Sequence, residues 1–142
     1  MTRITGPAPR VLVIEDDDDS RTVLGHLLTA EGYQLTDARN GLEGLRAARA
    51  CRPDVILLDV QMPVMDGFAF RRHQSADREL IGIPVICVSA LDGVCLQSRA
   101  LGDVQFVRKP IDFDKLLGAI RHATAGFTSV RSRALSATYR TA

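Results

Sequence analysis

The stretch VILLD (residues 55–59) is a continuous apolar run that ends on a carboxylate. Three further runs share this design: VLVI (11–14) before Glu15 and Asp16, VICV (85–88) before Ser89, and FV (106–107) before Arg108 and Lys109. Runs without polar alternation are typical of strands buried on both faces, as in a parallel sheet. Since ligands bind beyond the carboxyl ends of such strands, we expect these polar side chains to meet at one edge of the sheet.

The segments between these runs predict helices. Apolar residues at helical spacing indicate helices that begin after Asp19 or Ser20, after Asn40, near Phe68, within 92–101, and after Asp112 or Asp114. In the second helix we expect Leu42, Leu45 and Ala48 to face inward, and the weak alternation of 33–38 predicts a strand at the sheet edge. Strands that alternate with helices indicate βαβ units and therefore an α/β fold.

Length and composition predict one globular domain. The chain has 142 residues, is 46% hydrophobic and carries a net charge of +1, which gives no strong field for nucleic acid or membrane. We divide it into a flexible lead-in (1–9), a folded domain (10–124) and a basic tail or truncated linker (125–142). The three cysteines form no C-x-x-C pair, and no stretch reads as a signal peptide or membrane span, so we expect a cytoplasmic location.

The acidic residues at the strand ends suit phosphoryl chemistry. The Asp59 carboxylate is the candidate nucleophile, because a carboxylate can attack phosphorus and form an acyl phosphate. Glu15 and Asp16 would repel a third carboxylate unless a cation lay between them, and Mg²⁺, with Mn²⁺ as an alternative, prefers such oxygen ligands. The acids that follow, 17–19, are expected to form a solvated loop.

Ser89 and Lys109 could complete a phosphate site. The Ser89 hydroxyl can donate a hydrogen bond to a phosphoryl oxygen, and the Lys109 ammonium can pair with phosphate while offsetting the acids. Phosphoryl transfer needs mostly positioning and charge neutralisation, which this set supplies. The three histidines have no metal-ligand spacing, and no glycine-rich nucleotide loop is present, so bound nucleotide is not expected.

Taken together and in this order, four motifs resemble the receiver domain of two-component response regulators: VLVIEDD (11–17), VILLDVQMPVMDG (55–67), PVICVSA (84–90) and FVRKP (106–110). The resemblance runs from about residue 10 to residue 123. It implies a flavodoxin-like, doubly wound, five-stranded parallel sheet of order 2-1-3-4-5 with about five helices. The interval between Ala90 and Gly102 is shorter than is usual in the family, so we expect the fourth helix to be short or irregular.

The resemblance also implies a role for each motif residue. Asp59 matches the phosphoacceptor, and Mg²⁺ would be held by Glu15, Asp16, Asp59 and the backbone carbonyl of Gln61. Further matches concern the phosphate and the switch: Ser89 and Lys109 as phosphate-binding groups, Phe106 as the switch aromatic, Pro110 after a bond that is often cis, and Gln61 and Leu91 as residues that tune dephosphorylation. Leu91 could shield the phosphate, which would give a long-lived phosphoprotein.

The implied partners follow from the same resemblance. A sensor histidine kinase or a phosphotransfer protein would pass its phosphoryl group to Asp59. The altered surface would then signal to a downstream protein or to a second copy of the chain, without direct binding of nucleic acid or membrane. We expect such a chain to phosphorylate and dephosphorylate itself as a signalling switch rather than to act as a turnover enzyme.

Two alternatives use the same residues differently. The chain could be a receiver-like interaction module that is never phosphorylated. It could also be a magnesium-dependent phosphatase that resembles the haloacid dehalogenase superfamily, which combines the same residue types. In that superfamily, however, the nucleophile comes first in a D-x-D motif, whereas here the acidic pair leads and the sequence Asp59-Val60-Gln61 lacks the second Asp.

Overall fold

The computed structural model describes residues 8–62, 64–90 and 104–125, and five strands of this part of the chain form one parallel sheet. The strands are β1 (Arg10–Ile14), β2 (Gln34–Ala38), β3 (Val55–Asp59), β4 (Val85–Ser89) and β5 (Gln105–Arg108). Their order is β2-β1-β3-β4-β5, which confirms the predicted flavodoxin-like topology and places the 33–38 segment at an edge.

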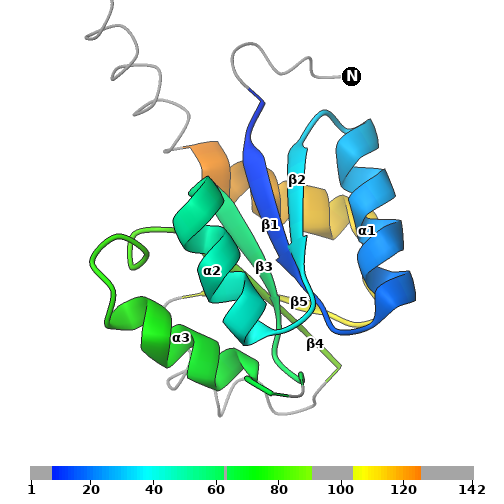
Figure 1. Ribbon diagram of the computed structural model, residues 1–142. Helices are drawn as coiled ribbons and strands as arrows, with labels where there is room; N and C mark the ends of the chain where they lie inside the picture. The colour runs from blue at the N-terminus through cyan, green and yellow to red at the C-terminus, as the bar shows by residue number, and fades with distance from the viewer. Residues whose placement is uncertain (1–7, 63, 91–103, 126–142) are drawn as a thin grey trace, which may run out of the picture.

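Helices cover both faces of the sheet (Figure 1). The labelled helices are α1 (Asp18–Ala30), α2 (Gly41–Cys51) and α3 (Gly67–Ser75), and residues 113–125 form a further helix. Figure 1 shows α2 and α3 on one face, with α1 and the 113–125 helix on the other. The predicted helix within 92–101 lies outside the described residues. No helix of the described chain is long and apolar enough to cross a membrane.

The core has two halves, one on each face of the sheet. On one face Phe70 of α3 and Leu45 of α2 pack against β1, β3 and β4, and on the other face Leu28 of α1 and Leu116 of the last helix do so. The prediction for Leu42 was wrong, because its side chain is 41% exposed. The buried stripe of α2 begins at Gly41, and each helical residue is turned by about 100° from the one before it, so Leu42 points away from the sheet.

The helix caps lie at the carboxyl edge of the sheet. Asn40 caps α2 as predicted, because its side-chain oxygen accepts the Glu43 N–H at 2.9 Å. The predicted cap of α1 at Asp19 or Ser20 was wrong, because Asp17 accepts the Ser20 N–H at 2.8 Å. Residues 18–19 therefore form the first helical turn instead of a loop, where acids favour the helix dipole. The capping residue of α1 thus directly follows the candidate metal ligands.

Gly67 lets the chain double back beside the end of β3. Its N–H donates a hydrogen bond of 3.0 Å to the Val60 carbonyl, and α3 begins at this residue. A Cβ atom added to Gly67 would lie 2.8 Å from Val60 Cα and 3.3 Å from the Asp59 carbonyl oxygen. Both neighbours are backbone atoms, so a side chain here would displace the segment that carries Asp59.

Replacement of Gly67 by alanine should destabilise the fold. We expect Gly67→Ala to lower the free energy of unfolding by about 1–3 kcal/mol, the usual cost of overpacking, in urea denaturation followed by circular dichroism. The matched control is Gly118→Ala, because Gly118 lies within the 113–125 helix and nothing lies within 4 Å of its added Cβ. That change should raise stability by about 0.5–1 kcal/mol. Equal effects at the two sites would contradict the packing argument.

Candidate functional site

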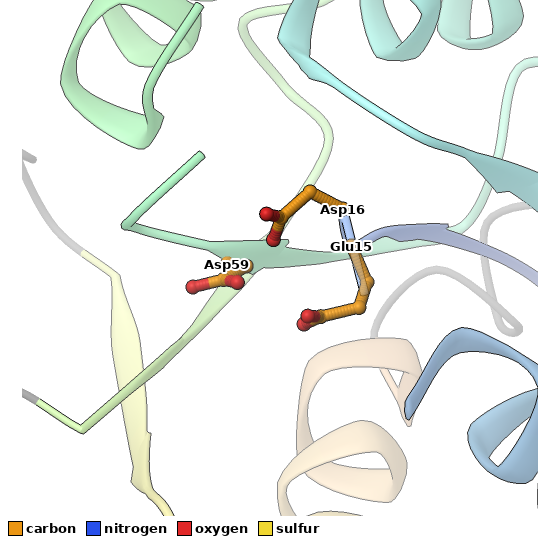
Figure 2. Close-up of side chains that lie close together, drawn as sticks. All are labelled: Glu15, Asp16 and Asp59. Carbon is orange, nitrogen blue, oxygen red and sulfur yellow. The ribbon is translucent and has the colours of Figure 1, made fainter. Parts of the chain in front are cut away.

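The ends of β1 and β3 bring three carboxylates together (Figure 2). The two strands are neighbours in which Ile14 pairs with Leu58, so the residues that follow on each strand lie side by side. Ligand oxygens of Glu15, Asp16 and Asp59 all lie within 4.8 Å of one another. The structure therefore confirms the expectation from the sequence that these three side chains lie close together.

Lys109 supplies the positive charge of this cluster. Its Nζ lies 3.4 Å from Asp59 Oδ2 and 3.5 Å from Glu15 Oε2. The Lys109 backbone N–H donates to the Ser89 carbonyl at 3.0 Å, which extends the pairing of β4 and β5 beyond the last residue of β5. The peptide bond between Lys109 and Pro110 is cis. One ammonium thus faces two buried carboxylates, and the charges do not balance.

Burial disturbs the acid–base behaviour of the cluster. Glu15 and Asp59 are only 3% and 5% exposed. Burial, helped by the nearby Asp59 charge, raises the pKa of Glu15 to about 7 against the opposing effect of Lys109. Burial also raises the pKa of Asp59, although the Gln61 N–H and Lys109 counteract it. Burial alone would lower the pKa of Lys109, but the attraction of the Asp59 and Glu15 carboxylates is stronger, and the pKa of this lysine is raised. Without a cation, Glu15 therefore binds a proton near neutral pH.

The donor set fits a hard divalent cation. All three grouped side chains offer carboxylate oxygens, which Mg²⁺ prefers over nitrogen and sulfur. Asp16 is exposed while its two neighbours in the cluster are buried, so one side of the cluster is open to solvent. Gln61 lies beside it, since its N–H donates to Asp59 Oδ1 at 3.1 Å, and its side chain is exposed.

The remaining predicted residues have different positions. Ser89 is 3% exposed at the end of β4, beside the Asp59 strand, because Asp59 pairs with Val88. Phe106 lies in β5 with 38% of its surface exposed, so its ring is not buried in this structure. Leu91 lies outside the described residues. The structure thus brings Lys109 to the carboxylates, places Ser89 at the end of the strand beside Asp59, and leaves Phe106 partly in solvent.

Sequence reasoning missed two residues that hold the acidic pair in place. The Asp17 N–H donates to Glu15 Oε1 at 3.3 Å, and Arg21 Nη1 donates to the Glu15 carbonyl at 2.9 Å. The only sequence signal for Arg21 is its position three residues after Asp18, a spacing at which helical charges can pair. Nothing in the sequence indicates that this guanidinium also reaches back to Glu15.

An apolar groove of about 390 Å³ adjoins the cluster. Its polar lining comes from Glu15, Asp19, Ser20 and Lys109. Its apolar lining comes from α1 and from the segment after β5, namely Val23, Leu24, Leu27, Pro110, Ile111 and Phe113. Val23 is 55% exposed and Leu27 39% exposed, so α1 presents apolar side chains to solvent beside the charged cluster. The groove therefore offers a contact surface that is continuous with the acidic residues.

Comparison with known proteins points to one family. The family model for the response regulator receiver domain matches residues 11–121. The response regulator PleD of Caulobacter vibrioides is 39% identical over 117 residues, which cover 81% of this chain but only 26% of PleD, so the chain spans about a quarter of that relative. Protein PilH of Pseudomonas aeruginosa is 34% identical over 119 residues, which cover 82% of this chain and 98% of PilH.

Solved structures show the same similarity. The signal receiver domain of a histidine kinase from Syntrophus aciditrophicus superposes with a TM-score of 0.78 at 35% identity, covering 84% of this chain and 92% of that chain. The receiver domain of a sensor histidine kinase from Pseudomonas aeruginosa has a TM-score of 0.77 at 26% identity, covering 84% of this chain and 99% of that chain. That structure contains a magnesium ion coordinated in the active site cleft.

The raised pKa of Glu15 predicts how stability depends on pH without divalent cation. This carboxyl group titrates at 4.5 when unperturbed and at about 7 in the folded protein, so the folded state binds more protons between these values. The free energy of unfolding must then fall as pH rises from 4.5 to about 7, and it should level off above that range. We expect a fall on the order of 1–3 kcal/mol in urea unfolding with a chelator present.

Two variants identify the source of this fall. Glu15→Gln removes the group and should abolish most of the decline. Glu43→Gln should keep it, because Glu43 is a surface partner of Arg39 whose hydrogen bonds lower the pKa of its carboxyl group. An undiminished decline in Glu15→Gln would show that another group is responsible.

Proposed function

Because this chain belongs to the response regulator receiver family, we propose that it is a signalling switch that accepts a phosphoryl group on Asp59. The observation that carries the proposal is the placement of this buried carboxylate, whose oxygens lie near those of Glu15 and Asp16 and 3.4 Å from Lys109 Nζ. A sensor histidine kinase or a phosphotransfer protein would be the donor.

The proposed reaction is an attack by one Asp59 oxygen on phosphorus. A phosphorus–oxygen bond forms as the bond from phosphorus to the donor nitrogen breaks, and the departing imidazole keeps the electron pair. The Gln61 N–H and Lys109 Nζ hold different Asp59 oxygens, which restricts rotation of the carboxylate before the attack. Lys109 then stays beside the added phosphoryl charge.

Glu15, Asp16 and Asp59 would hold Mg²⁺, with the Gln61 carbonyl as a further ligand. The bound cation supplies charge neutralisation for the phosphoryl oxygens and for the excess of carboxylates. The proposal is supported by the oxygen-only donor set and by the magnesium ion in the related Pseudomonas aeruginosa receiver domain. Mn²⁺ is an alternative of the same coordination chemistry.

The proposed switch involves Ser89 and Phe106. Ser89 would donate a hydrogen bond to the phosphoryl group from the end of β4, and Phe106 would move from its partly exposed position toward the interior. The phosphoryl group would thereby favour one of two existing conformations, and the changed surface would bind a downstream protein or a second copy. The phosphoryl group would leave by hydrolysis, tuned by Gln61 and Leu91, so the chain acts as a switch and not as a turnover enzyme.

The apolar groove beside the cluster is the proposed contact surface for the phosphodonor. It is continuous with the acceptor site, because Glu15 and Lys109 form part of its lining. A donor that must place a phosphohistidine at Asp59 has to cover this neighbouring surface. The exposed Val23 and Leu27 of α1 offer that donor apolar area to bury.

Replacement of Asp59 by asparagine should abolish phosphorylation. We expect Asp59→Asn to take up no phosphate from acetyl phosphate with Mg²⁺, because an amide oxygen cannot form a stable acyl phosphate. Phosphate-affinity electrophoresis and intact mass measure the uptake. Asp114→Asn is the control, since Asp114 is exposed in the last helix, and it should be labelled like the wild type.

Undiminished labelling of Asp59→Asn would refute the acceptor assignment. Failure of the wild-type chain to become labelled by any phosphodonor would favour the interaction module that is never phosphorylated. Steady turnover of an ordinary phosphomonoester would favour the phosphatase alternative.

Replacement of Val23 by serine should slow transfer from a protein donor alone. With a sensor kinase that labels the wild type, we expect Val23→Ser to reduce the transfer rate about tenfold, the effect of losing one good apolar contact. The rate with acetyl phosphate should not change, because this small donor does not need the groove. Ile81→Ser is the matched control: Ile81 is 57% exposed, close to the 55% of Val23, but does not line the groove.

Equal slowing by Val23→Ser and Ile81→Ser would argue against the groove as the contact surface. Slower labelling of Val23→Ser by acetyl phosphate would indicate damage to the acceptor site itself.

A further inference from the structure

Arg21 joins three elements at the edge of the acidic cluster. Its guanidinium donates a hydrogen bond of 2.9 Å to the Glu15 carbonyl, and only 12% of its side chain is exposed. The same group pairs with Asp18 in the first turn of α1, and its Nε lies 3.6 Å from Asp37 in β2. One side chain thus links the segment after β1 to α1 and to the edge strand.

Asp16 depends on its backbone for its orientation. Its side chain is exposed, and within the described part of the chain no hydrogen bond or ion pair restrains its carboxylate. Its carboxylate oxygen nevertheless lies within 4.8 Å of ligand oxygens of Glu15 and Asp59 (Figure 2). The peptide groups on either side of Asp16 set the direction of its Cα–Cβ bond and therefore the region that its carboxylate can reach.

Both of these peptide groups are anchored. The peptide between Glu15 and Asp16 carries the carbonyl that Arg21 holds, and because a peptide is planar, fixing its oxygen restricts the whole unit. The peptide after Asp16 carries the Asp17 N–H, which donates to Glu15 Oε1 at 3.3 Å. The Asp17 side chain in turn caps α1 through the Ser20 N–H. Hydrogen bonds thus anchor the peptide group on each side of Asp16, and Arg21 makes the one to the first of these groups.

We propose that Arg21 is a positioning residue for the cation site, which directs the Asp16 carboxylate toward Asp59 by holding the Glu15 carbonyl. The inference rests on the proposed function, because it assigns Arg21 to the same cation. A residue that acted only by its positive charge would repel the cation, and its loss would tighten binding. Loss of a positioning residue lets Asp16 turn away and weakens binding.

The test is the affinity of the metal-free protein for Mg²⁺ alone, measured by isothermal titration calorimetry. We expect about tenfold weaker binding in Arg21→Met, the lower end of the effect seen when groups that orient metal ligands are removed. Arg21→Lys keeps the charge but loses the planar fork of donors, so we expect a smaller loss of the same sign. Asp37→Asn removes an outer contact of Arg21 and should change the affinity by less than about twofold.

A second readout comes from the metal-free protein. In ¹⁵N spectra the amide resonance of Asp16 should move in both Arg21 variants and stay in place in Asp37→Asn. A role confined to overall stability would lower the melting temperature without this local change or any change in affinity. If Arg21→Met does not fold, Arg21→Lys decides the question, because its charge is unchanged and any loss of affinity reports geometry.

Mg²⁺ binding by the folded Arg21→Met protein that equals or exceeds wild-type affinity would overturn the inference and leave the proposed function intact. The same holds for unchanged affinity in Arg21→Lys if it is the only folded variant. Absence of Mg²⁺ binding by the wild type is a different outcome, because it would refute the cation site itself.

Discussion

Two buried carboxylates and a third beside them, at the ends of neighbouring strands, are the constraint on which the rest of this site depends. Glu15 and Asp59 are almost completely removed from water, which is costly for negative charges that are not neutralised. Lys109 neutralises part of this charge from a third strand end. The remaining negative charge explains two properties of the cluster. Glu15 binds a proton near neutral pH when no cation is present, and the three carboxylates offer oxygen ligands to a cation.

The sequence was sufficient to predict the sheet and the members of the cluster. Apolar runs such as 55–58 are buried at every position, and in a parallel sheet the residue after each run can only lie at the carboxyl edge. The convergence of Glu15, Asp59 and Lys109 therefore follows from strand direction and order. The start of a helix was also predictable where the sequence offered one residue that could cap it, as for Asn40.

Two kinds of feature could not be predicted from the sequence: the direction in which a residue points from its helix axis, and the contacts that a side chain makes in the folded structure. Several acids in a row could cap α1, and the sequence does not show that Asp17 is the one whose oxygen reaches the Ser20 N–H. Leu42 has the composition of a core residue, but the helix turns it outward. Arg21 looks like an ordinary helix-surface arginine, and its contact with the Glu15 carbonyl exists only because α1 packs against the end of β1.

The order in which the charges occur along the chain has a consequence for synthesis on the ribosome. Lys109 lies 94 residues after Glu15 and 50 residues after Asp59, so the acids leave the ribosome long before their cation partner. Until the last strand joins the sheet, these carboxylates lack the ammonium that makes their burial tolerable. The charges of the cluster are therefore brought together only after the fifth strand has been synthesised and has joined the sheet, because Lys109 directly follows that strand.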